Sequence, residues 1–531
     1  MTETVIRAGT GGSERPATEP PRGSAARLRI PEGPVDAMLT AAARTYPDRA
    51  AIRTEGRKIT YAALDAMATD WAKTVHDFFG GRPGPVAVAQ ALDPLFPAVY
   101  YGILRAGGTA AVVNPLLPAP LLLHVLRTCG ARLAVLPRAV YERLLTVREG
   151  LPALERVIVL GEESPETGSG AAWQRPEEPG DEDRAVILFT SGSTGTPKAV
   201  QLSHRNVKVN TAQMAASHRI GTASRLLLHL PIYHPMHMNT AVSVAATQIL
   251  SAGAHSSDAL ALADRTAATH YYTFPARLLA LAADPDLAML RPKTVGFMAT
   301  GGTAVPPAVV RTLADALGVG LMQGYGMCET SSLATGDDPD APKPGSVGIP
   351  LAGSSIRIVE PGTGRVLPAH EIGEIQVRGP HVMQGYLGHA GPSPVDAAGW
   401  LATGDMGHLD EDGYLFMFDR LKDVFRCGGE LVSPTAVERV LYEHPAVRDC
   451  AVVGTADAGL GSVAVAFVVL ADGAGIRTLP AVVDTVNDAL SAGQRIRRAE
   501  LVRGIPRLAN GKVDRGELRT RLGGLGDVGD A

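Results

Sequence analysis

The chain has 531 residues, of which 45% are hydrophobic and 20% charged, and its formal net charge is −4. A chain of this length is too long to fold around a single hydrophobic core, so we expect a globular protein with two or more domains. The nearly balanced charge provides no general attraction to nucleic acid or to an anionic membrane, so any binding of phosphate must be local.

The cysteine usage and the N-terminal segment indicate the compartment. Four scattered cysteines without a Cys-x-x-Cys pair predict a cytoplasmic protein with neither a disulfide framework nor a zinc site. Residues 1–28 are rich in Gly, Pro, Thr, Ser and charge, which predicts a disordered tail rather than a signal peptide. No apolar run reaches the roughly 18 residues of a membrane span. We therefore expect no membrane span and no nucleic-acid partner.

Helical and strand patterns alternate through the first third of the chain. We expect strands at 58–61, 86–91, 110–113, 132–136 and 156–160, separated by helices at 34–45, from 62 onward, and at 96–106, 121–129 and 141–147. Strands separated by helices are typical of parallel sheets with helices packed against them. The predicted fold class is therefore α/β, with a large N-terminal domain of this kind.

Past residue 353 the pattern changes to short strands at 354–359, 374–377 and 414–418, typical of a small antiparallel, barrel-like subdomain. Beyond a charged stretch at 419–423, Ser433 and Pro434 predict a helix start, because an N-cap hydroxyl precedes a proline at the first helical position. Later strands and a helix complete a small α+β domain. We predict a tail at 1–28, an N-terminal domain at 29–419, a mobile C-terminal domain at 420–521 and a tail at 522–531.

The segment ILFTSGSTGTPKAV at 187–200 contains the strongest local signal. An apolar run at 185–189 predicts a strand, which ends in a loop of hydroxyls and glycines followed by a lysine: Thr190, Ser191, Gly192, Ser193, Thr194, Gly195 and Lys198. Such a loop turns its N–H groups toward one point and binds phosphate oxygens, with the lysine as countercharge. The spacing differs from that of a Walker A loop. A flexible linker is the alternative, but linkers seldom lie between two apolar strands.

This loop resembles the phosphate-binding signature of the adenylate-forming superfamily, which includes acyl-CoA synthetases, aryl-CoA ligases and peptide adenylation domains. Further segments follow in the order that the family shows: ATGGTAVP at 299–306, MQGYGMCET at 322–330, WLATGD at 400–405, DRLKD at 419–423 and NGKVDR at 510–515. With weaker matches near the N-terminus, the resemblance extends from about residue 35 to 518 and is closest to acyl-CoA ligases.

The resemblance assigns the nucleotide site. It implies that the segment with Gly301 and Gly302 cradles adenine, that Tyr325 contacts the adenine, and that Glu329 binds Mg²⁺. A carboxylate is a suitable hard ligand for Mg²⁺ on nucleotide phosphates. Cys328 stands where the family has a threonine that contacts the α-phosphate, and a thiol is a poorer donor.

The later motifs supply the ribose contacts, the hinge and the catalytic lysine. The resemblance implies that Asp405 holds the ribose hydroxyls, that Arg420 contacts ribose and phosphate, and that Lys422 is the pivot of the C-terminal domain. Asp419 replaces the usual glycine before this hinge, and we expect it to stiffen the turn. Lys512, which alone would be taken for a surface lysine, corresponds to the lysine that bridges the attacking carboxylate and the α-phosphate.

One histidine has a counterpart in the family. His234, in LPIYHPMHMN, resembles the histidine that closes the acyl pocket, although a structural core or surface histidine is the alternative. His237 has no comparable support. The two form an H-x-x-H pair, but no nearby cysteine or carboxylate completes a metal site. The expected catalytic residues are therefore Lys512, His234 and Glu329.

The implied reaction is ATP-dependent activation of a carboxylic acid as an acyl adenylate, followed by transfer to coenzyme A. We expect ATP, Mg²⁺ and coenzyme A to be required, and a small aryl or fatty acid to be the substrate. An F-D pair that anchors an α-amino group is missing between Tyr233 and Val244, so amino acids are less favoured. No carrier domain follows Ala531, so a stand-alone enzyme is expected.

Two alternatives stay open. A stand-alone adenylating enzyme would pass its activated group to an acyl carrier protein or an amine, and some such relatives activate nitrite. A nucleotide-binding regulatory protein that has lost catalysis would explain Cys328 and Asp419 as early changes, although Lys512, Glu329 and Asp405 are all retained. Pyrophosphate release separates these hypotheses.

Overall fold

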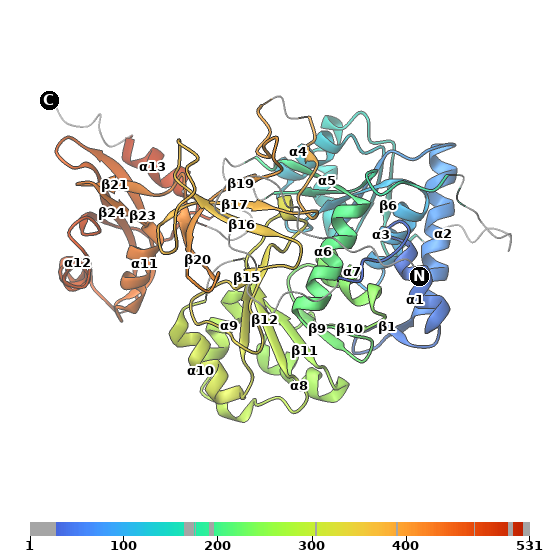
Figure 1. Cartoon of the computed structure of the whole chain (residues 1–531), viewed down its shortest axis with the longest axis horizontal. Coiled ribbons are helices and arrows are strands. Elements are labelled where there is room, and N and C mark those ends of the chain that lie inside the picture. The colour runs from blue at the N-terminus through green and yellow to red at the C-terminus, as the bar shows by residue number, and fades with distance from the viewer. Residues whose placement is uncertain are drawn as a thin grey trace.

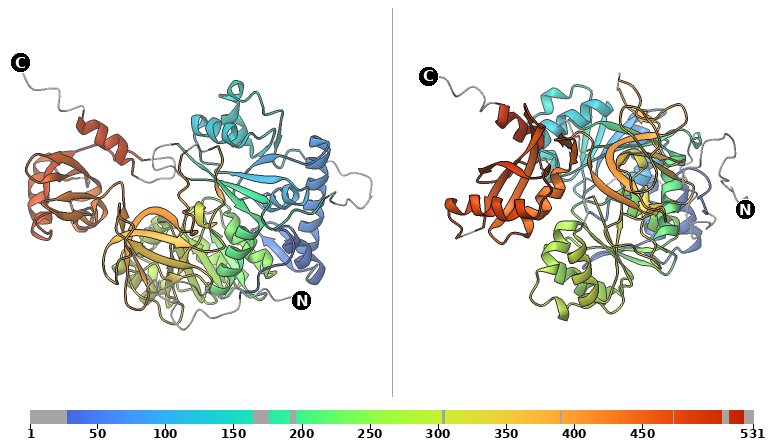
Figure 2. Two further views of the ribbon diagram at one scale, coloured as in Figure 1. Left: turned by 45° about the horizontal axis from the view of Figure 1, so that its top comes forward. Right: turned by 60° about the vertical axis from the view of Figure 1, so that its left-hand side comes forward.

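The structure is a computed structural model, and it describes residues 28–163, 175, 177–190, 196–302, 305–388, 391–471, 473–507 and 513–523. A large part contains two sheets with their helices, and a smaller part follows strand β20 (Leu415–Arg420) at one end of the molecule (Figure 1). The left view of Figure 2 shows this smaller part set apart from the two sheets. In the described ranges, no helix has the length and apolar character that crossing a membrane requires.

The first sheet has seven strands in the order β18-β8-β7-β4-β3-β5-β6. They are β3 (Pro85–Ala89), β4 (Thr109–Val113), β5 (Leu133–Leu136), β6 (Arg156–Val159), β7 (Arg184–Phe189), β8 (Ala199–Ser203) and β18 (Gly385–Tyr386). Five of them run parallel, whereas β8 and β18 extend one edge in the antiparallel sense. The alternation of helices and strands in the sequence predicted this parallel arrangement, and the structure confirms it.

The second sheet also has seven strands, in the order β13-β12-β11-β9-β10-β1-β2. They are β1 (Ala50–Arg53), β2 (Lys58–Thr60), β9 (Arg225–His229), β10 (Thr247–Leu250), β11 (His270–Thr273), β12 (Phe297–Gly301) and β13 (Leu321–Gly324). Only the hairpin of β1 and β2 is antiparallel. The carboxyl ends of parallel strands share one edge, which is where α/β proteins commonly bind ligands.

Helices fill the space between the sheets and cover their outer faces. The inner helices share one core cluster with both sheets: α1 (Ala37–Thr45), α2 (Tyr61–Phe79), α3 (Phe96–Arg105), α6 (His204–Ser217) and α7 (Pro235–Ser243). Outside the first sheet lie α4 (Ala119–Cys129) and α5 (Arg138–Leu145), and outside the second lie α8 (Ser256–Thr266), α9 (Pro275–Ala282) and α10 (Pro307–Leu317). Local capping sets the bounds of α2, because the Thr60 hydroxyl accepts from Ala63 N and Gly80 adopts φ 63°.

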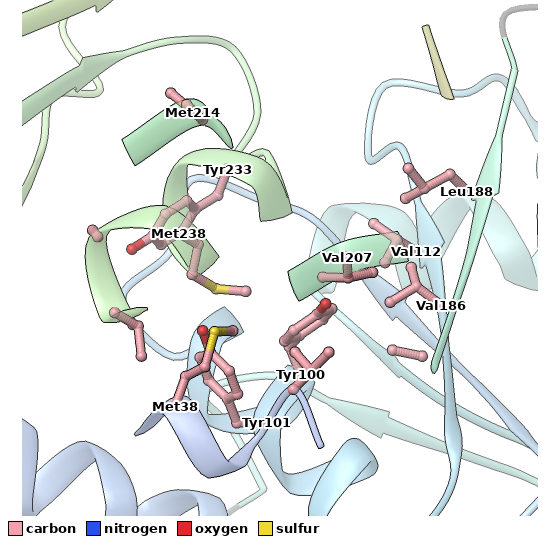
Figure 3. Close-up of a cluster of buried hydrophobic side chains, with 14 of the residues drawn as sticks. Met38, Tyr100, Tyr101, Val112, Val186, Leu188, Val207, Met214, Tyr233 and Met238 are labelled. Carbon is pink, nitrogen blue, oxygen red and sulfur yellow. The ribbon is translucent and has the colours of Figure 1, made fainter. Parts of the chain in front are cut away.

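The inner layer is built around large buried side chains, among them Tyr100, Tyr101 and Tyr233 (Figure 3). The hydroxyl groups of these tyrosines are hydrogen-bonded. Tyr100 and Tyr101 of α3 both bind Asn239 of α7: the Tyr101 hydroxyl donates to Asn239 Oδ1 at 2.8 Å, and Asn239 Nδ2 donates to the Tyr100 hydroxyl at 3.1 Å. Tyr233 donates to Gln248 Oε1 at 2.6 Å. Satisfied polar groups allow these tyrosines to be buried without a large desolvation cost.

A four-stranded antiparallel sheet follows the two large sheets. Its strands are β16 (Ser355–Val359), β17 (Gly373–Arg378), β19 (Leu401–Leu409) and β20, in that order. The sequence predicted three of these strands but not β19, which contains Gly404. Gly404 adopts φ 71°, yet the chain on both sides of it pairs with β17 and β20.

The C-terminal part contains a sheet in the order β22-β21-β24-β23, with β25 parallel to β24. Its elements are β21 (Phe425–Cys427), β22 (Glu430–Val432), α11 (Pro434–Glu443), β23 (Val447–Asp457), β24 (Gly461–Leu470), α12 (Leu479–Asp488), β25 (Ile496–Leu501) and α13 (Arg515–Gly523). As predicted, Ser433 caps α11 and Pro434 is its first residue. Helices on both faces of the sheet give this part its own core.

Candidate active site

The segment that the sequence predicts to bind phosphate starts at the end of β7 and returns at β8, so it is flanked by two strands as expected. Thr190 N donates to Lys198 O at 3.0 Å, and Lys198 N donates to Thr190 Oγ1 at 3.1 Å, so both ends of the loop are held together. Residues 191–195, with Ser191, Gly192, Ser193, Thr194 and Gly195, lie outside the described residues. The described part therefore fixes the base of the loop and the position of Lys198.

Tyr386 connects Lys198 to Glu329, and sequence reasoning missed it. Strand β18 pairs with β8, which places Tyr386 opposite Val200. The Lys198 ammonium lies 4.8 Å from the centre of the Tyr386 ring, and the Tyr386 hydroxyl donates to Glu329 Oε1 at 2.6 Å. The sequence contains one indication of this residue: Gly385 and Gly388 lie on either side of Tyr386. The same pattern is found in many turns, so it did not single out Tyr386.

Glu329 is a buried carboxylate beside a cation. It lies in the short turn η3 (Cys328–Thr330) and is 5% exposed. Burial raises the pKa of Glu329 above its ordinary value, while the hydrogen bond from Tyr386 and the charge of Lys198 counteract that rise. Within the described ranges, no group of three or more His, Cys, Asp or Glu residues could hold a metal ion. A single carboxylate is nevertheless sufficient for Mg²⁺, which usually keeps several waters and phosphate oxygens as ligands.

Tyr325 and the glycines predicted to surround adenine come together at one sheet edge. Gly301 ends β12 and pairs with Gly324 at the end of β13, and Gly302 adopts φ 98°. Gly326 turns the chain closely past another segment: a Cβ there would lie 1.9 Å from Ser332 O. Only glycine fits this approach, so the turn places Tyr325 at the carboxyl ends of two parallel strands.

Asp405 and Arg420 lie beside Tyr325, although they come from a different sheet. The two residues are paired across β19 and β20, with Arg420 Nε 3.6 Å from Asp405 Oδ1. The Tyr325 hydroxyl donates to Asp405 Oδ2 at 2.8 Å. The structure therefore brings the residues expected at adenine and at ribose into direct contact.

Cys328 connects this group to the β7–β8 hairpin. Its thiol lies 3.7 Å from the carbonyl oxygen of Phe189, the last residue of β7. A thiol is a weak donor, so it contributes less to an anion at this position than a hydroxyl would.

His234 starts helix α7. Its Nδ1 accepts from Met236 N at 3.2 Å, and burial lowers its pKa to about 4, so the imidazole is neutral near pH 7. His237 is one turn further and packs edge-on against Tyr272, with ring centres 4.7 Å apart. His234 is therefore a capping residue in this structure, in addition to any role toward a ligand.

A small cavity lies where α6, α7, strands β7 and β8, and the segment after η3 meet. Apolar side chains form much of its wall, and polar groups of Asn210, Thr211, Asn239 and two serines complete it; the apolar set includes Val186, Leu188, Leu202, Val207 and Met236. Figure 3 shows Val186, Leu188, Val207 and Tyr100 grouped on this side of the inner layer. Ser332 lines the cavity with a buried hydroxyl that lacks a hydrogen-bond partner.

The remaining predicted residues belong to the C-terminal part. Lys422 is exposed and follows β20 by two residues. Lys512 lies outside the described residues, whereas Arg507 and Val513 on either side of it form a β-bridge.

Comparison with known proteins identifies the family. The model of the AMP-binding enzymes matches residues 39–387, and the model of their C-terminal domain matches residues 436–512. The chain is 32% identical to a feruloyl-CoA synthase of Amycolatopsis sp, over 91% of this chain and 97% of that protein. The chain therefore belongs to the AMP-binding enzyme family, as its motifs suggested.

Solved structures share the whole fold. The anthranilate CoA ligase AuaEII in complex with anthranoyl-AMP aligns with a TM-score of 0.81 at 25% identity, covering 93% of this chain and 98% of that one. MatB from Rhodopseudomonas palustris aligns over 91% of this chain and 98% of its own, with a TM-score of 0.80 when ATP-bound (27% identity) and 0.71 as the apo protein (26% identity). The protein is an ATP-dependent, AMP-forming acid–thiol ligase, which forms an acyl adenylate and then a coenzyme A thioester.

Proposed function

We propose that this ligase acts on an aromatic or similarly apolar carboxylic acid. One observation supports this most directly: the apolar cavity and the nucleotide residues share two segments. Leu188 lines the cavity one residue before the end of β7, where the hydroxyl loop begins, and Ser331 lines it two residues after Glu329. The cavity in this structure has room only for a water-sized group, so binding requires its apolar walls to open. An acid that enters between these two segments would direct its carboxylate toward the ATP phosphates.

We assign the contacts to the nucleotide from the way these side chains are grouped in the site. Tyr325 with Gly301 and Gly302 would hold adenine, and Asp405 with Arg420 would hold ribose. The hydroxyl loop with Lys198 would hold the departing phosphates, and Cys328 would give a weak contact to the α-phosphate. Fixed donors at these positions stabilise charge that develops on the phosphates.

Glu329 fits a Mg²⁺ site, because its carboxylate is buried, held by Tyr386 and close to Lys198. When bound, Mg²⁺ supplies charge neutralisation to the phosphates. Tyr386 would keep the carboxylate in one orientation, a task that supporting hydrogen bonds commonly perform around metal ligands.

The first half-reaction joins the acid to ATP. A carboxylate oxygen attacks the α-phosphorus, the bond from that phosphorus to the bridging oxygen breaks, and pyrophosphate leaves. Lys512 would neutralise the charge at this centre. His234, neutral near pH 7 and located where α7 starts beside the cavity, would close the acyl side.

The second half-reaction transfers the acyl group. The thiolate of coenzyme A attacks the acyl carbonyl carbon, and AMP leaves with the bonding electrons. We propose that the C-terminal domain, which we place at 420–521 after an N-terminal domain at 29–419, turns about Lys422 between the two steps and withdraws Lys512. Hinge motions of this kind complete one site and open another.

Pyrophosphate release tests the activity and the acid. We would incubate the enzyme with MgATP and a panel of aryl, fatty and amino acids and nitrite, with and without coenzyme A. We expect pyrophosphate with aryl acids and consumption of coenzyme A in equal amount. Release without consumption of coenzyme A would favour a carrier protein or an amine as acceptor, and release with nitrite alone would favour nitrite activation. No pyrophosphate from any combination would contradict adenylation.

The Lys512→Ala variant tests the catalytic lysine. We expect adenylation to fall by about 10² to 10³, because a donor aimed at the developing charge is lost. Nucleotide binding, measured by calorimetry, should change little. The Arg521→Ala variant of α13 is a control on the same C-terminal segment, since Arg521 pairs with Glu517 at the surface. Near-full adenylation by Lys512→Ala would remove the role proposed for this lysine.

A further inference from the structure

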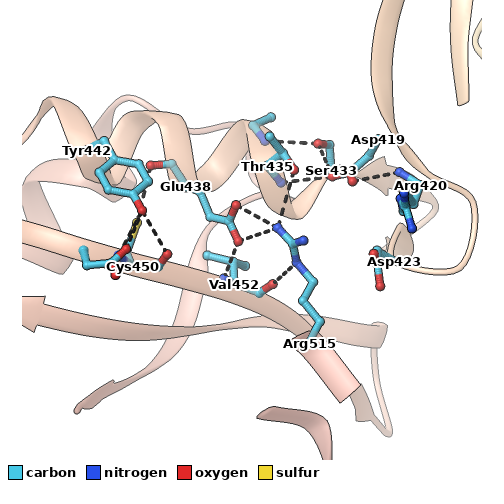
Figure 4. Close-up of polar contacts among 12 residues, drawn as sticks. Asp419, Arg420, Asp423, Ser433, Thr435, Glu438, Tyr442, Cys450, Val452 and Arg515 are labelled. Atoms are coloured by element: carbon cyan, nitrogen blue, oxygen red, sulfur yellow. Dashed lines mark hydrogen bonds and ion pairs between the residues drawn. The ribbon is translucent and has the colours of Figure 1, made fainter. Parts of the chain in front are cut away.

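Asp419 makes contacts across the proposed hinge. It lies in β20, three residues before Lys422, and its partners lie beyond the hinge at the start of α11 (Figure 4). Asp419 Oδ2 accepts from Ser433 Oγ at 2.8 Å and from Thr435 N at 3.0 Å. Its other oxygen, Oδ1, accepts from Arg420 N at 2.8 Å. The Asp419 carboxylate therefore accepts hydrogen bonds from residues on both sides of the proposed hinge.

The start of a helix is a favourable place for this carboxylate. The first N–H groups of a helix lack partners within it, and the helix dipole favours negative charge there. Ser433 satisfies one of these groups, Ala436 N, and Asp419 satisfies another, Thr435 N. Helix α11 thus has one cap from its own side of the hinge and a second from β20.

Helix α11 is connected by hydrogen bonds to Arg515, which follows Lys512 closely in the sequence. Arg515, three residues after Lys512, donates to both carboxylate oxygens of Glu438 in α11, at 2.6 and 2.7 Å. Arg515 Nε also donates to Val452 O at 3.2 Å, and Val452 N donates to Glu438 at 2.8 Å. Glu438 is buried and Arg515 half-buried against β23, so α11, β23 and the start of α13 form a single packed group.

We propose that Asp419 is a positioning residue for adenylation, which holds the C-terminal domain, and with it Lys512, in the orientation of the first half-reaction. This inference rests on the proposed hinge at Lys422. The ATP-bound and apo forms of MatB give TM-scores of 0.80 and 0.71 with this chain, so the arrangement of its parts is closer to the ATP-bound form. Rotation about Lys422 would separate Asp419 from Ser433 and Thr435.

The test measures the two half-reactions separately in full-length variants. Adenylation is followed by exchange of pyrophosphate into ATP, and thioester formation by a single turnover of adenylate already formed on the enzyme. In Asp419→Ala, we expect adenylation to slow about tenfold, as loss of hydrogen bonds to a charged group implies. Thioester formation should stay the same or become faster. Asp419→Asn should be intermediate, because its amide oxygen still accepts.

Glu430→Gln is a matched control. Glu430 also accepts from a serine hydroxyl, Ser491 Oγ, and from a backbone N–H, Gly493 N at 2.9 Å, but all three residues lie beyond the hinge. We expect it to leave the ratio of the two rates unchanged. Thermal unfolding of each variant reports any general loss of stability.

The outcomes separate this inference from the proposed function. A lower ratio of adenylation to thioester formation in Asp419→Ala, and not in Glu430→Gln, supports the inference. An unchanged ratio, whether both rates fall or neither does, overturns it while the wild type remains active. A wild type that forms no adenylate contradicts the proposed function instead. Should Asp419→Ala fail to fold, Ser433→Ala removes the same cross-hinge hydroxyl contact and is judged by the same ratio.

Discussion

At the scale of single residues, the site depends on one aromatic side chain that serves two charged groups. Tyr386 offers its ring to Lys198 and its hydroxyl to Glu329. A cation over an aromatic face and a carboxylate that accepts from the hydroxyl are both favourable contacts. Tyr386 therefore lies between Lys198 and Glu329 and contacts both. Glu329 and Lys198 thereby face the place where phosphates and Mg²⁺ are expected without forming a closed ion pair.

The Tyr386→Phe variant tests this arrangement. It keeps the ring under Lys198 but removes the donor to Glu329, so the pKa of Glu329 should rise further and its orientation should loosen. We expect the Mg²⁺ concentration for half-maximal adenylation to rise about tenfold, and the acidic limb of the pH–rate profile to move to higher pH. Adenylation assays across Mg²⁺ concentration and pH measure both effects.

Tyr414→Phe is the control for this variant, because its hydroxyl also makes a 2.6 Å hydrogen bond, to Ala341 O, away from the site. An unchanged Mg²⁺ dependence in Tyr386→Phe would show that Tyr386 does not orient the Glu329 carboxylate.

At the scale of elements, the turn after β13 explains why the sequence places glycines around Tyr325. Ala334 N and Thr335 N both donate to Tyr325 O, at 2.8 and 3.0 Å, so the turn folds back on the following segment. The backbone there passes too close to Gly326 for any side chain. The requirement is local in sequence, which is why the motif is visible without a structure.

Gly326→Ala should therefore be costly. Its Cβ would lie 1.9 Å from Ser332 O and 2.7 Å from Leu333 Cα, and backbone atoms cannot move away as a flexible side chain can. We expect a loss of about 2 to 4 kcal/mol in the free energy of unfolding, with weaker ATP binding. Denaturant unfolding and calorimetry measure the two.

Gly221→Ala is the matched control, since its Cβ would meet no atom within 4 Å. Equal stability of Gly326→Ala and Gly221→Ala would mean that the turn relaxes easily and does not constrain Tyr325.

At the scale of the whole molecule, burial of histidines makes stability depend on pH. Burial lowers the pKa of His218 to about 3 and the pKa of His204, His229 and His381 to about 4, below the ordinary 6.5. Between these values the unfolded chain binds protons that the folded chain does not. Each histidine therefore lowers the free energy of unfolding by about 1.4 kcal/mol per pH unit as the pH falls from 6.5 to 4.

Buried carboxyls act in the opposite sense, since burial raises the pKa of Asp337 to about 6 and of Glu438 to about 7. Among the described residues, His234 and further buried histidines also have a lowered pKa, and the histidines outnumber the carboxyls whose pKa burial raises, Glu329 included. We therefore expect a net loss of stability of a few kcal/mol between pH 6.5 and 5. Urea unfolding across this range measures it, and His381→Gln should flatten the dependence. Stability that rises on acidification in this window would contradict the assignment of neutral buried histidines.

The fold and the site differ in how far the sequence predicted them. The parallel sheets follow from alternating helix and strand patterns, and the Ser433–Pro434 cap of α11 follows from two adjacent residues. Strand β19 was missed because its pairing with β17 and β20 depends on partners elsewhere in the chain. Tyr386 was missed because its partner Glu329 is 57 residues away.

By itself, the sequence determined the alternation of helices and strands in the first third of the chain, the two strands that flank the hydroxyl loop, the glycine turn at Tyr325 and membership of the adenylate-forming enzymes. These features depend on residues close together in the chain, where backbone geometry and residue type act directly. Only the tertiary structure decided that Tyr386 holds Glu329, that Tyr325 meets Asp405, and that Asp419 caps a helix beyond the hinge. Such contacts require sheets and helices to pack first, because packing brings together side chains that the chain itself keeps apart.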